Sequence, residues 1–403
     1  MRIGVDATAL YGRYGGVEYS LWNLLSALRV ENSSHEFRVF IPHDGPPPAQ
    51  LRAFDARWKF IRLPFRGEEK LRRIFWQQAV LPGQLTREKC DLLHSPTYVA
   101  PLRTPVPVAL TVYDLIALSQ PQFATPLNRK HYGLMLPQSI QGARRIIAPS
   151  ENVKWEISLR FPEAAQRTRV VPLGLEPIFF QAPSTPALDE VRKRYDLPEK
   201  YLLFVGNFEP KKNLANLLRA LNTLPDAPTL IVSGGMRAWP DSEIENAKIE
   251  NSENEQRDSE HCNSEHCDSE QSSGEKTNDG STPRVRGIGY VARRDLPALY
   301  AQCEAFVFPS LAEGFGLPVL EALACGASVV TSAAVPLPNL SEAAIICEPH
   351  SPASIASAIG GVLGSASERA RLKAAGHEYA RPFTWRRAAR QTAEIYEETV
   401  AAK

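Results

Sequence analysis

Short apolar, β-branched stretches alternate with helical or proline-rich segments along most of this chain. After the first such stretch, Ile3–Val5, a helix is predicted from Glu18, because Leu21, Leu24, Leu25 and Leu28 recur at helical spacing. The strand-like stretches form two series, at residues 3–5, 37–41, 92–94, 108–112 and 146–148, and at 201–205, 230–233, 285–287, 305–309, 328–331 and 344–347. A string of strand-then-helix units predicts a mainly parallel, doubly wound sheet.

The length of 403 residues is too great for one compact core and suggests two domains. A proline-rich stretch, residues 172–198, separates the two series and is interpreted as a linker. We therefore predict an α/β protein with two Rossmann-like doubly wound domains that face each other across a cleft. The expected ranges are 1–172 and 173–385, followed by a C-terminal helix at 386–403 that could pack back on the first domain.

An acidic segment, residues 241–284, interrupts the second series after its second strand. It is poor in apolar residues and rich in Ser, Glu, Asn and Asp, so a disordered surface loop is expected. Its tandem repeat brings His261, Cys262, His266 and Cys267 close together in sequence, which could provide ligands for zinc or copper. A five-residue repeat also arises by simple duplication, and we favour an inert insertion over a metal site.

The acidic segment also masks the charge of the rest of the chain. It carries thirteen acidic and four basic residues, a net charge of −9 within a whole-chain charge of +1, so the remainder carries +10. A moderately basic folded part suits anionic ligands or anionic lipid head groups, and no nucleic-acid-binding motif accompanies it. The four cysteines outside the segment have no regular spacing and are expected to be reduced and mostly buried.

The expected location is the cytoplasm, with peripheral contact to the inner face of the membrane left open. Residues 1–6 contain an acid where a signal peptide needs an apolar stretch, and no apolar run of about 18 residues occurs. The stretch Arg72–Trp76 could touch a membrane that carries a lipid-linked acceptor. The alternative, slightly favoured, is an ordinary amphipathic helix with Trp76 in the core.

The most informative segment is 308–326, where a buried strand is followed by a glycine-bearing loop and a helix. Pro318 is suited to the first helical position and Gly326 to the helix stop. Free backbone amides of the loop residues, with the positive end of the helix dipole, would form a phosphate site; these residues are Gly314, Phe315, Gly316 and Leu317. Glu313 and Glu321 would then accept hydrogen bonds from sugar or ribose hydroxyls, or alternatively only cap and charge the helix.

Two further places suggest contact with an anionic ligand. Gly206 begins a loop that leads to Lys211 and Lys212 at the predicted start of a helix over 214–221, where cations favour a compensating anion or are simply solvated. Gly15 and Gly16 follow the first strand and would let the backbone approach a ligand closely, although plain turns also contain such pairs.

With these motifs, the chain resembles the retaining nucleotide-sugar glycosyltransferases of family 4, which have the GT-B fold. The most specific similarity is Glu313-Gly-Phe-Gly-Leu-Pro-Val-Leu-Glu321, which is similar to the E-x7-E element of that family. Also similar are Gly15-Gly16-Val17-Glu18, His94-Ser95-Pro96, 112–116, Ala148-Pro149-Ser150, 171–174, and Gly206 with 210–213.

The resemblance implies roles for these residues. Glu321 would bind the nucleotide ribose and Glu313 the donor sugar, while Lys211, Lys212 and the glycine pair would contact the diphosphate. His94 and Ser150 would belong to the substrate site, and Asp114 could position the acceptor or the sugar. The family commonly has His-Asp where this chain has Tyr113-Asp114, and a phenol donates a hydrogen bond but does not carry a proton at neutral pH.

The implied reaction transfers a hexose, mannose favoured, from a nucleoside-diphosphate sugar to a hydroxyl of a glycan or lipid-linked acceptor, with retention and without metal or cofactor. Glu313, Asp114 and Tyr113 would be the catalytic residues. Two alternatives remain open: a nucleotide-sugar-binding protein weakened in catalysis by Tyr113, and a nucleotide-sugar epimerase on the same fold.

Overall fold

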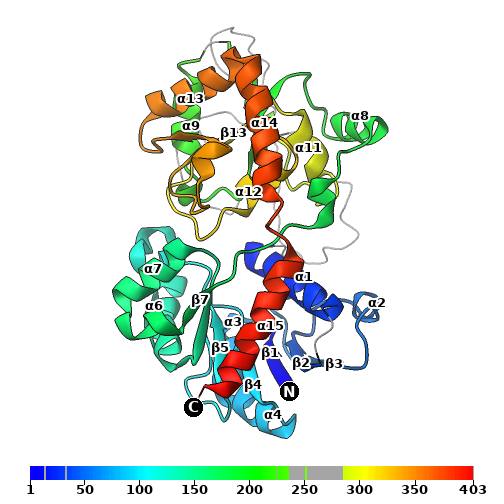
Figure 1. Ribbon diagram of the computed structural model, residues 1–403, viewed down its shortest axis with the longest axis vertical. Coiled ribbons are helices and arrows are strands. Elements are labelled where there is room, and N and C mark those ends of the chain that lie inside the picture. The colour runs from blue at the N-terminus through cyan, green and yellow to red at the C-terminus, as the bar shows by residue number, and fades with distance from the viewer. Residues whose placement is uncertain (13–14, 32–33, 225, 236–249, 252–284, 403) are drawn as a thin grey trace. The chain divides into compact units, whose positions relative to one another are not determined.

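The computed structural model describes residues 1–12, 15–31, 34–224, 226–235, 250–251 and 285–402. Its contacts divide the chain into two compact units, which we describe separately (Figure 1). The N-terminal unit contains Met1–Glu176, Glu313–Leu317 and Pro382–Lys403, and the C-terminal unit contains Pro177–Ala312 and Pro318–Arg381.

The N-terminal unit is built on a seven-stranded parallel sheet with the order β3-β2-β1-β4-β5-β6-β7. Its strands are β1 Arg2–Asp6, β2 Glu36–Ile41, β3 Trp58–Arg62, β4 Leu92–Ser95, β5 Val108–Thr111, β6 Arg145–Ala148 and β7 Thr168–Val170. Its helices are α1 Gly16–Val30, α2 Pro48–Leu51, α3 Lys70–Phe75, α4 Leu81–Arg87, α5 Ile116–Ser119, α6 Pro126–Gly142, α7 Glu151–Arg160 and α15 Trp385–Ala401. The strand order reverses beside β1, as in doubly wound folds.

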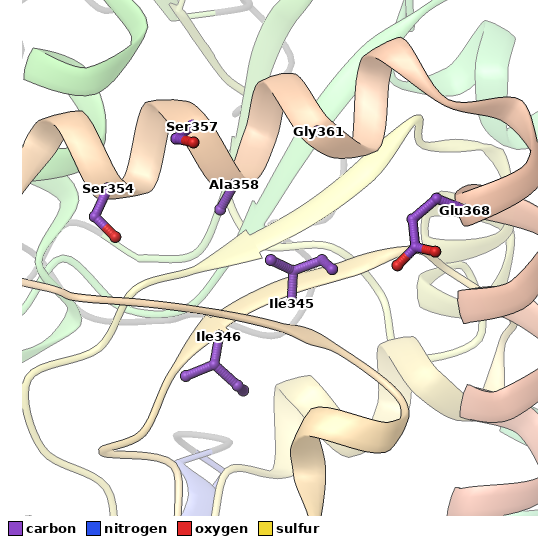
Figure 2. Close-up of a pocket in the computed structure, with 7 residues that line it drawn as sticks. All are labelled: Ile345, Ile346, Ser354, Ser357, Ala358, Gly361 and Glu368. Atoms are coloured by element: carbon purple, nitrogen blue, oxygen red, sulfur yellow. The ribbon is translucent and has the colours of Figure 1, made fainter.

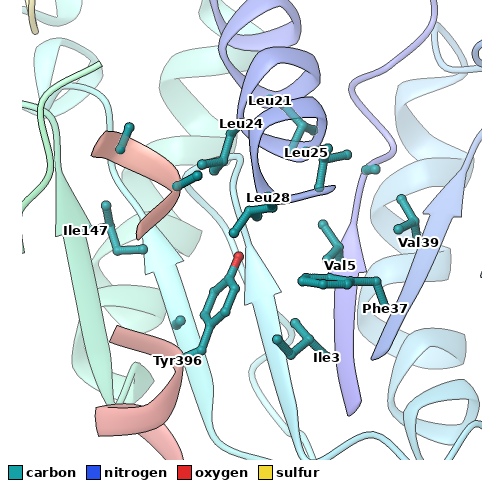
Figure 3. Packing of buried hydrophobic residues seen from close by; sticks show 14 of the residues in the cluster. Ile3, Val5, Leu21, Leu24, Leu25, Leu28, Phe37, Val39, Ile147 and Tyr396 are labelled. Atoms are coloured by element: carbon teal, nitrogen blue, oxygen red, sulfur yellow. The ribbon is translucent and has the colours of Figure 1, made fainter. Parts of the chain in front are cut away.

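Helix α15 completes the core of this unit although it ends the chain. Figure 3 shows Tyr396 of α15 beside Ile147 of β6 and the leucines of α1 that the helical spacing predicted. These leucines, Leu21, Leu24, Leu25 and Leu28, are all buried. Apolar residues from the chain's two ends thus share one hydrophobic cluster.

The C-terminal unit has a second seven-stranded parallel sheet, with the order β10-β11-β9-β8-β12-β13-β14. Its strands are β8 Tyr201–Val205, β9 Thr229–Ser233, β10 Glu250–Asn251, β11 Val285–Gly287, β12 Ala305–Phe308, β13 Val329–Ser332 and β14 Ile345–Cys347. Its helices are α8 Thr185–Arg194, α9 Leu214–Leu221, α11 Leu296–Gln302, α12 Leu317–Ala324, α13 Pro352–Gly364 and α14 Ala366–Ala380. The α/β prediction with two doubly wound sheets is confirmed.

The expected boundary at 172/173 is corrected to 176/177. Residues 173–176 stay with the N-terminal unit because Leu175 pairs with Thr384, and Tyr19 donates a 2.9 Å hydrogen bond to Glu176. Part of the expected linker is also structured, since α8 occupies 185–194.

The acidic segment falls almost entirely outside the described residues. Residues 241–249 and 252–284, including the His and Cys repeat, are not described, while Glu250–Asn251 pairs as the short edge strand β10 with β11. The four cysteines outside the segment are free thiols; Cys90, Cys303 and Cys347 are buried and Cys325 is partly buried.

Candidate functional site

The loop and helix predicted over 308–326 form as expected at the end of β12. Helix α12 begins at Leu317, with Pro318 in its first turn. Gly316 has a φ of +99° and Gly326 a φ of +70°, a left-handed region that favours glycine. Gly316 thus permits the turn into α12, and Gly326 follows the end of the helix.

Glu321 is buried on α12 and is held by two side chains from outside its helix. Arg293 Nη2 lies 2.6 Å from Glu321 Oε1, and the Tyr300 hydroxyl donates to Oε2 at 3.1 Å. The guanidinium also lies over the Phe179 ring, 4.7 Å from its centroid. No acid stands in the first turn of α12, so the capping alternative is wrong for Glu321. Its carboxylate is instead a fixed acceptor.

Gly206, Lys211 and Lys212 gather at the carboxyl ends of β8 and β12, which are neighbours in the sheet. The Lys212 ammonium lies 4.9 Å from the Phe308 ring centroid, and Lys211 forms a 3.4 Å ion pair with Glu209. The Lys211 carbonyl accepts from Ser310 Oγ at 2.9 Å and from the Leu311 amide at 2.7 Å. The two predicted anion-binding segments are therefore joined by direct hydrogen bonds.

The lysines lie before α9 rather than on it. They form a short turn, Pro210–Lys212, and Asn213, with a φ of +63°, separates that turn from the helix. The unfavourable placement of cations at the start of 214–221 that the sequence suggested is therefore corrected, and Glu209 already compensates part of the charge.

Gly15 and Gly16 stand at the N-terminus of α1. Gly15 has an ordinary φ of −73°, so its backbone does not require glycine. A Cβ built at either residue meets no atom of the described residues within 4 Å. Among those residues, the glycines leave room at the helix end, and Gly15 relieves no backbone strain.

A second group of predicted residues lies in the N-terminal unit around the end of β5. The Tyr98 hydroxyl donates to Asp114 Oδ2 at 2.8 Å, and the Ile116 amide donates to Oδ1 at 3.0 Å. Tyr113 is buried, and burial raises the pKa of its phenol far above neutrality. Asp114 is thus a fixed carboxylate beside a phenol that stays protonated.

The loop 313–317 belongs to the same unit and contacts residues close to Tyr113 and Asp114. Ser150 caps α7 and donates from Oγ to the Gly314 carbonyl at 2.9 Å. A Cβ at Gly314 would lie 2.0 Å from the Tyr113 carbonyl oxygen, so only glycine fits there. Phe315 is buried against Phe383, with ring centroids 6.1 Å apart. Ser150 therefore positions the loop through its backbone.

His94, which was predicted to belong to the substrate site, lies inside the core of the N-terminal unit. Its side chain is fully buried, Nε2 lies 2.9 Å from Thr111 Oγ1, and Nδ1 lies 2.8 Å from the Tyr396 hydroxyl. Burial lowers the pKa of His94 to about 3, so the ring is neutral. Both nitrogens are occupied inside the core, and His94 joins α15 to the sheet instead.

Sequence reasoning missed several residues of these groups. Arg293, Tyr300 and Tyr98 carry no local motif, and only the fold brings them to the carboxylates they hold. Gly234 was also missed: its φ is +146°, and a Cβ there would lie 2.1 Å from the Gly206 carbonyl oxygen. A glycine directly after a predicted strand was the one available signal.

Trp76 lies in the core of the N-terminal unit, which confirms the slightly favoured interpretation of Arg72–Trp76 for that side chain. Leu71 and Phe75 of α3 are nevertheless exposed, by 75% and 67%. Within the described ranges, the helices are either too short or too polar to cross a bilayer.

A shallow depression in the C-terminal unit lies apart from the predicted residues. Figure 2 shows Ile345 and Ile346 of β14 opposite the small residues Ser354, Ser357 and Ala358 of α13. None of the residues that line it was predicted to bind substrate.

Two family models match the chain. The model described as Glycosyltransferase Family 4 matches residues 14–178, and the model described as Glycosyl transferases group 1 matches residues 189–379. The chain belongs to the group 1 glycosyl transferases, and its two parallel sheets with their helices form the GT-B fold.

Similar proteins carry related names. The chain is 27% identical over 309 residues to O-antigen chain mannosyltransferase B of Escherichia coli, covering 76% of this chain and 74% of that protein. It is 28% identical over 335 residues to a D-inositol 3-phosphate glycosyltransferase of Salinispora tropica, covering 77% of this chain and 64% of that protein. The crystal structure of Anabaena HepE in complex with UDP and glucose is similar with a TM-score of 0.70 and 19% identity, covering 98% of this chain and 99% of that one.

Proposed function

We propose that this protein is a retaining hexosyltransferase. It moves a hexose, mannose favoured, from a nucleoside-diphosphate sugar to a hydroxyl of a glycan or lipid-linked acceptor in surface polysaccharide or glycolipid synthesis. The preference for mannose and for polysaccharide is supported by the similarity to O-antigen chain mannosyltransferase B. The nucleotide-sugar donor is supported by the similarity to HepE, which was crystallised with UDP and glucose.

The observation that carries the proposal is the joined segment pair in the C-terminal unit. The turn with Lys211 and Lys212 is hydrogen-bonded to the start of the loop that leads into α12, and α12 carries Glu321 as a fixed acceptor. Cations and amides stabilise a diphosphate, and a carboxylate accepts from the vicinal hydroxyls of a ribose. One unit thereby offers contacts to both the diphosphate and the ribose of the donor.

The difficult event in sugar transfer is departure of the diphosphate. Negative charge grows on it as the glycosidic bond breaks, and fixed amides with Lys211 and Lys212 would stabilise that charge without a metal. We propose that the acceptor oxygen attacks the anomeric carbon from the side on which the diphosphate leaves. The departing phosphate oxygen takes the acceptor's proton, and the anomeric configuration is kept. Glu313 would bind donor-sugar hydroxyls and Asp114 would orient the acceptor or the sugar.

Incubation with isotope-labelled donors tests this function. Wild-type protein is expected to transfer hexose from one of GDP-, UDP-, ADP- or dTDP-linked donors to a mannoside acceptor, or to hydrolyse that donor slowly. The coupling between H1 and C1 in the NMR spectrum of the product reports its anomeric configuration. A product with inverted anomeric configuration would contradict the proposed mechanism. If no donor were turned over, the proposal that the protein is an enzyme would be contradicted.

Tyr113 favours one alternative, a nucleotide-sugar-binding protein with weak catalysis. A buried phenol with a raised pKa holds its proton throughout the neutral range and cannot act as an acid or base there. Binding of a nucleotide sugar without transfer or hydrolysis would support this alternative.

A further inference from the structure

Two short rows of polar residues on α3 and α6 meet in the N-terminal unit. Lys70 and Arg73 are three residues apart on α3, and Asn128 and His131 are three residues apart on α6, so each pair shares one face of its helix. The Lys70 ammonium donates to Asn128 Oδ1 at 2.5 Å and so connects the two rows. We call Lys70, Arg73 and His131 the basic cluster.

Within the described part of the chain, the basic cluster has no carboxylate as counterion. Arg73 donates to the Gly67 carbonyl at 3.3 Å, and no described carboxylate forms an ion pair with Lys70 or Arg73. By contrast Arg72, on the exposed side of α3, is paired with Glu69 at 2.8 Å. Burial and the neighbouring Arg73 lower the pKa of Lys70, and burial with both cations lowers the pKa of His131. Half-buried cations that repel one another would be stabilised by an anion.

A row of aromatic rings leads from the basic cluster to Asp114. The His131 ring lies 5.2 Å from Tyr132, Tyr132 lies 5.6 Å from Tyr98, and the Tyr98 hydroxyl is bonded to Asp114. Tyr98 has a left-handed φ of +70°, which is rare for a residue with a side chain, and its hydrogen bond to Asp114 holds the ring in this row. Aromatic faces and a carboxylate are the groups that proteins offer to sugar rings and hydroxyls.

We propose that the basic cluster binds a phosphate ester of the acceptor and that the tyrosine row directs the acceptor's sugar toward Asp114. The inference rests on the proposed function and gives the acceptor a chemical class, a phosphorylated saccharide. The phosphate could belong to a free sugar phosphate or to a lipid head group. Leu71 and Phe75, exposed on the same helix, would suit a lipid.

Calorimetry on the full chain with glucose 1-phosphate, and with glucose as the uncharged control, tests the site. Wild type should bind the phosphate ester more tightly than glucose. The double variant Lys70→Gln with Arg73→Gln should weaken that binding at least about tenfold, since each charge-assisted hydrogen bond contributes on that order. Arg72→Gln, which changes a paired cation on the same helix, should stay within about twofold. Cosedimentation of the same variants with phosphatidylcholine vesicles, with and without phosphatidic acid, shows whether the basic cluster also binds a lipid phosphate.

The outcomes separate clearly. Equal binding by wild type and the double variant in both assays would overturn the proposal, as would loss of binding in a Lys211→Gln, Lys212→Gln variant alone, which would place the phosphate at the donor lysines. If the double variant melts early, His131→Asn should still reduce binding. Donor hydrolysis without acceptor is measured in parallel. If wild type hydrolyses the donor but the basic cluster does not bind the phosphate ester, only this inference is refuted. If wild type does not hydrolyse any donor, the proposed function is refuted.

Discussion

At the scale of single residues, two hydrogen-bond donors hold the buried Glu321 carboxylate in a fixed orientation. A buried carboxylate is costly unless donors surround it, and Arg293 and Tyr300 provide them. The same pair that stabilises the ion also fixes the direction of its remaining lone pairs. If Glu321 binds the ribose as proposed, the contacts that stabilise the fold here also position the ligand's acceptor.

Replacement of Arg293 by Met should destabilise the C-terminal unit. It leaves the carboxylate buried with the Tyr300 hydroxyl as its described donor from another element, a loss of roughly 3 kcal/mol. For a unit of this size the midpoint of thermal unfolding should fall by about 6 °C or more. Arg294→Met is the matched control because that side chain is 76% exposed. Equal midpoints for the two variants would show that the pair contributes nothing.

His94 should make the N-terminal unit sensitive to acid. The pKa of His94 is about 3 when folded against an ordinary value of 6.5, so below pH 6.5 the unfolded chain binds a proton that the folded chain refuses. The contribution of neutral His94 to the free energy of unfolding is complete above pH 6.5. It is lost between pH 6.5 and about 3, at roughly 1.4 kcal/mol per pH unit. Urea titrations at pH 7.5, 6 and 5 should show a shallower pH dependence for His94→Gln, and parallel dependences would contradict this assignment.

At the scale of elements, the N-terminus of α1 provides a test that spares the fold. In Gly15→Ala the new methyl meets no described atom within 4 Å, and the backbone is already extended, so stability should fall by no more than about 0.5 kcal/mol, the preference for glycine over alanine at an N-cap. If a diphosphate approaches this helix end, kcat/KM should fall at least about tenfold because the methyl occupies the ligand's space. Gly360→Ala in α13, equally uncrowded, is the control. Full activity in both variants would remove α1 from the site.

Strong apolar runs allowed the strands to be predicted closely. The predicted ranges 201–205, 214–221 and 285–287 match β8, α9 and β11 to the residue. Strand β3 was missed because Lys59 and Arg62 interrupt its apolar pattern, although Trp58 stacks on Phe37 at 3.9 Å. Helix α8 was taken as linker because the prolines of residues 172–198 were counted as breakers, whereas Pro186 stands in the first turn of the helix.

The candidate site was only partly predictable for a different reason. Loop chemistry is local, so the glycines and acids of 313–321 could be recognised from their order alone. The partners that set their properties come from 293 and 300 for Glu321 and from 98 for Asp114, and no short pattern encodes such distances. His94 shows the opposite case, because a polar residue near the end of a strand can equally form its hydrogen bonds inside the core.

At the scale of the whole molecule, the proposed contacts fall into two groups, one in each unit. The C-terminal unit gathers Lys211, Lys212 and Glu321 at the carboxyl ends of its strands, where doubly wound sheets bind ligands. The N-terminal unit contains the N-terminus of α1, Asp114 and the basic cluster. That the two groups line one cleft remains a prediction. Turnover of a labelled donor is the property that would require both groups to act on one substrate.

The central claim is that Glu321 and the lysines hold a nucleoside-diphosphate sugar. Isothermal titration of the full chain with GDP-, UDP-, ADP- and dTDP-sugars tests it most directly. We predict that one donor binds clearly best, that Glu321→Gln and Lys212→Gln each weaken it at least about tenfold, and that Glu304→Gln, in the same unit, leaves it unchanged. Equal affinity in wild type and in properly folded Glu321→Gln and Lys212→Gln proteins would contradict the account.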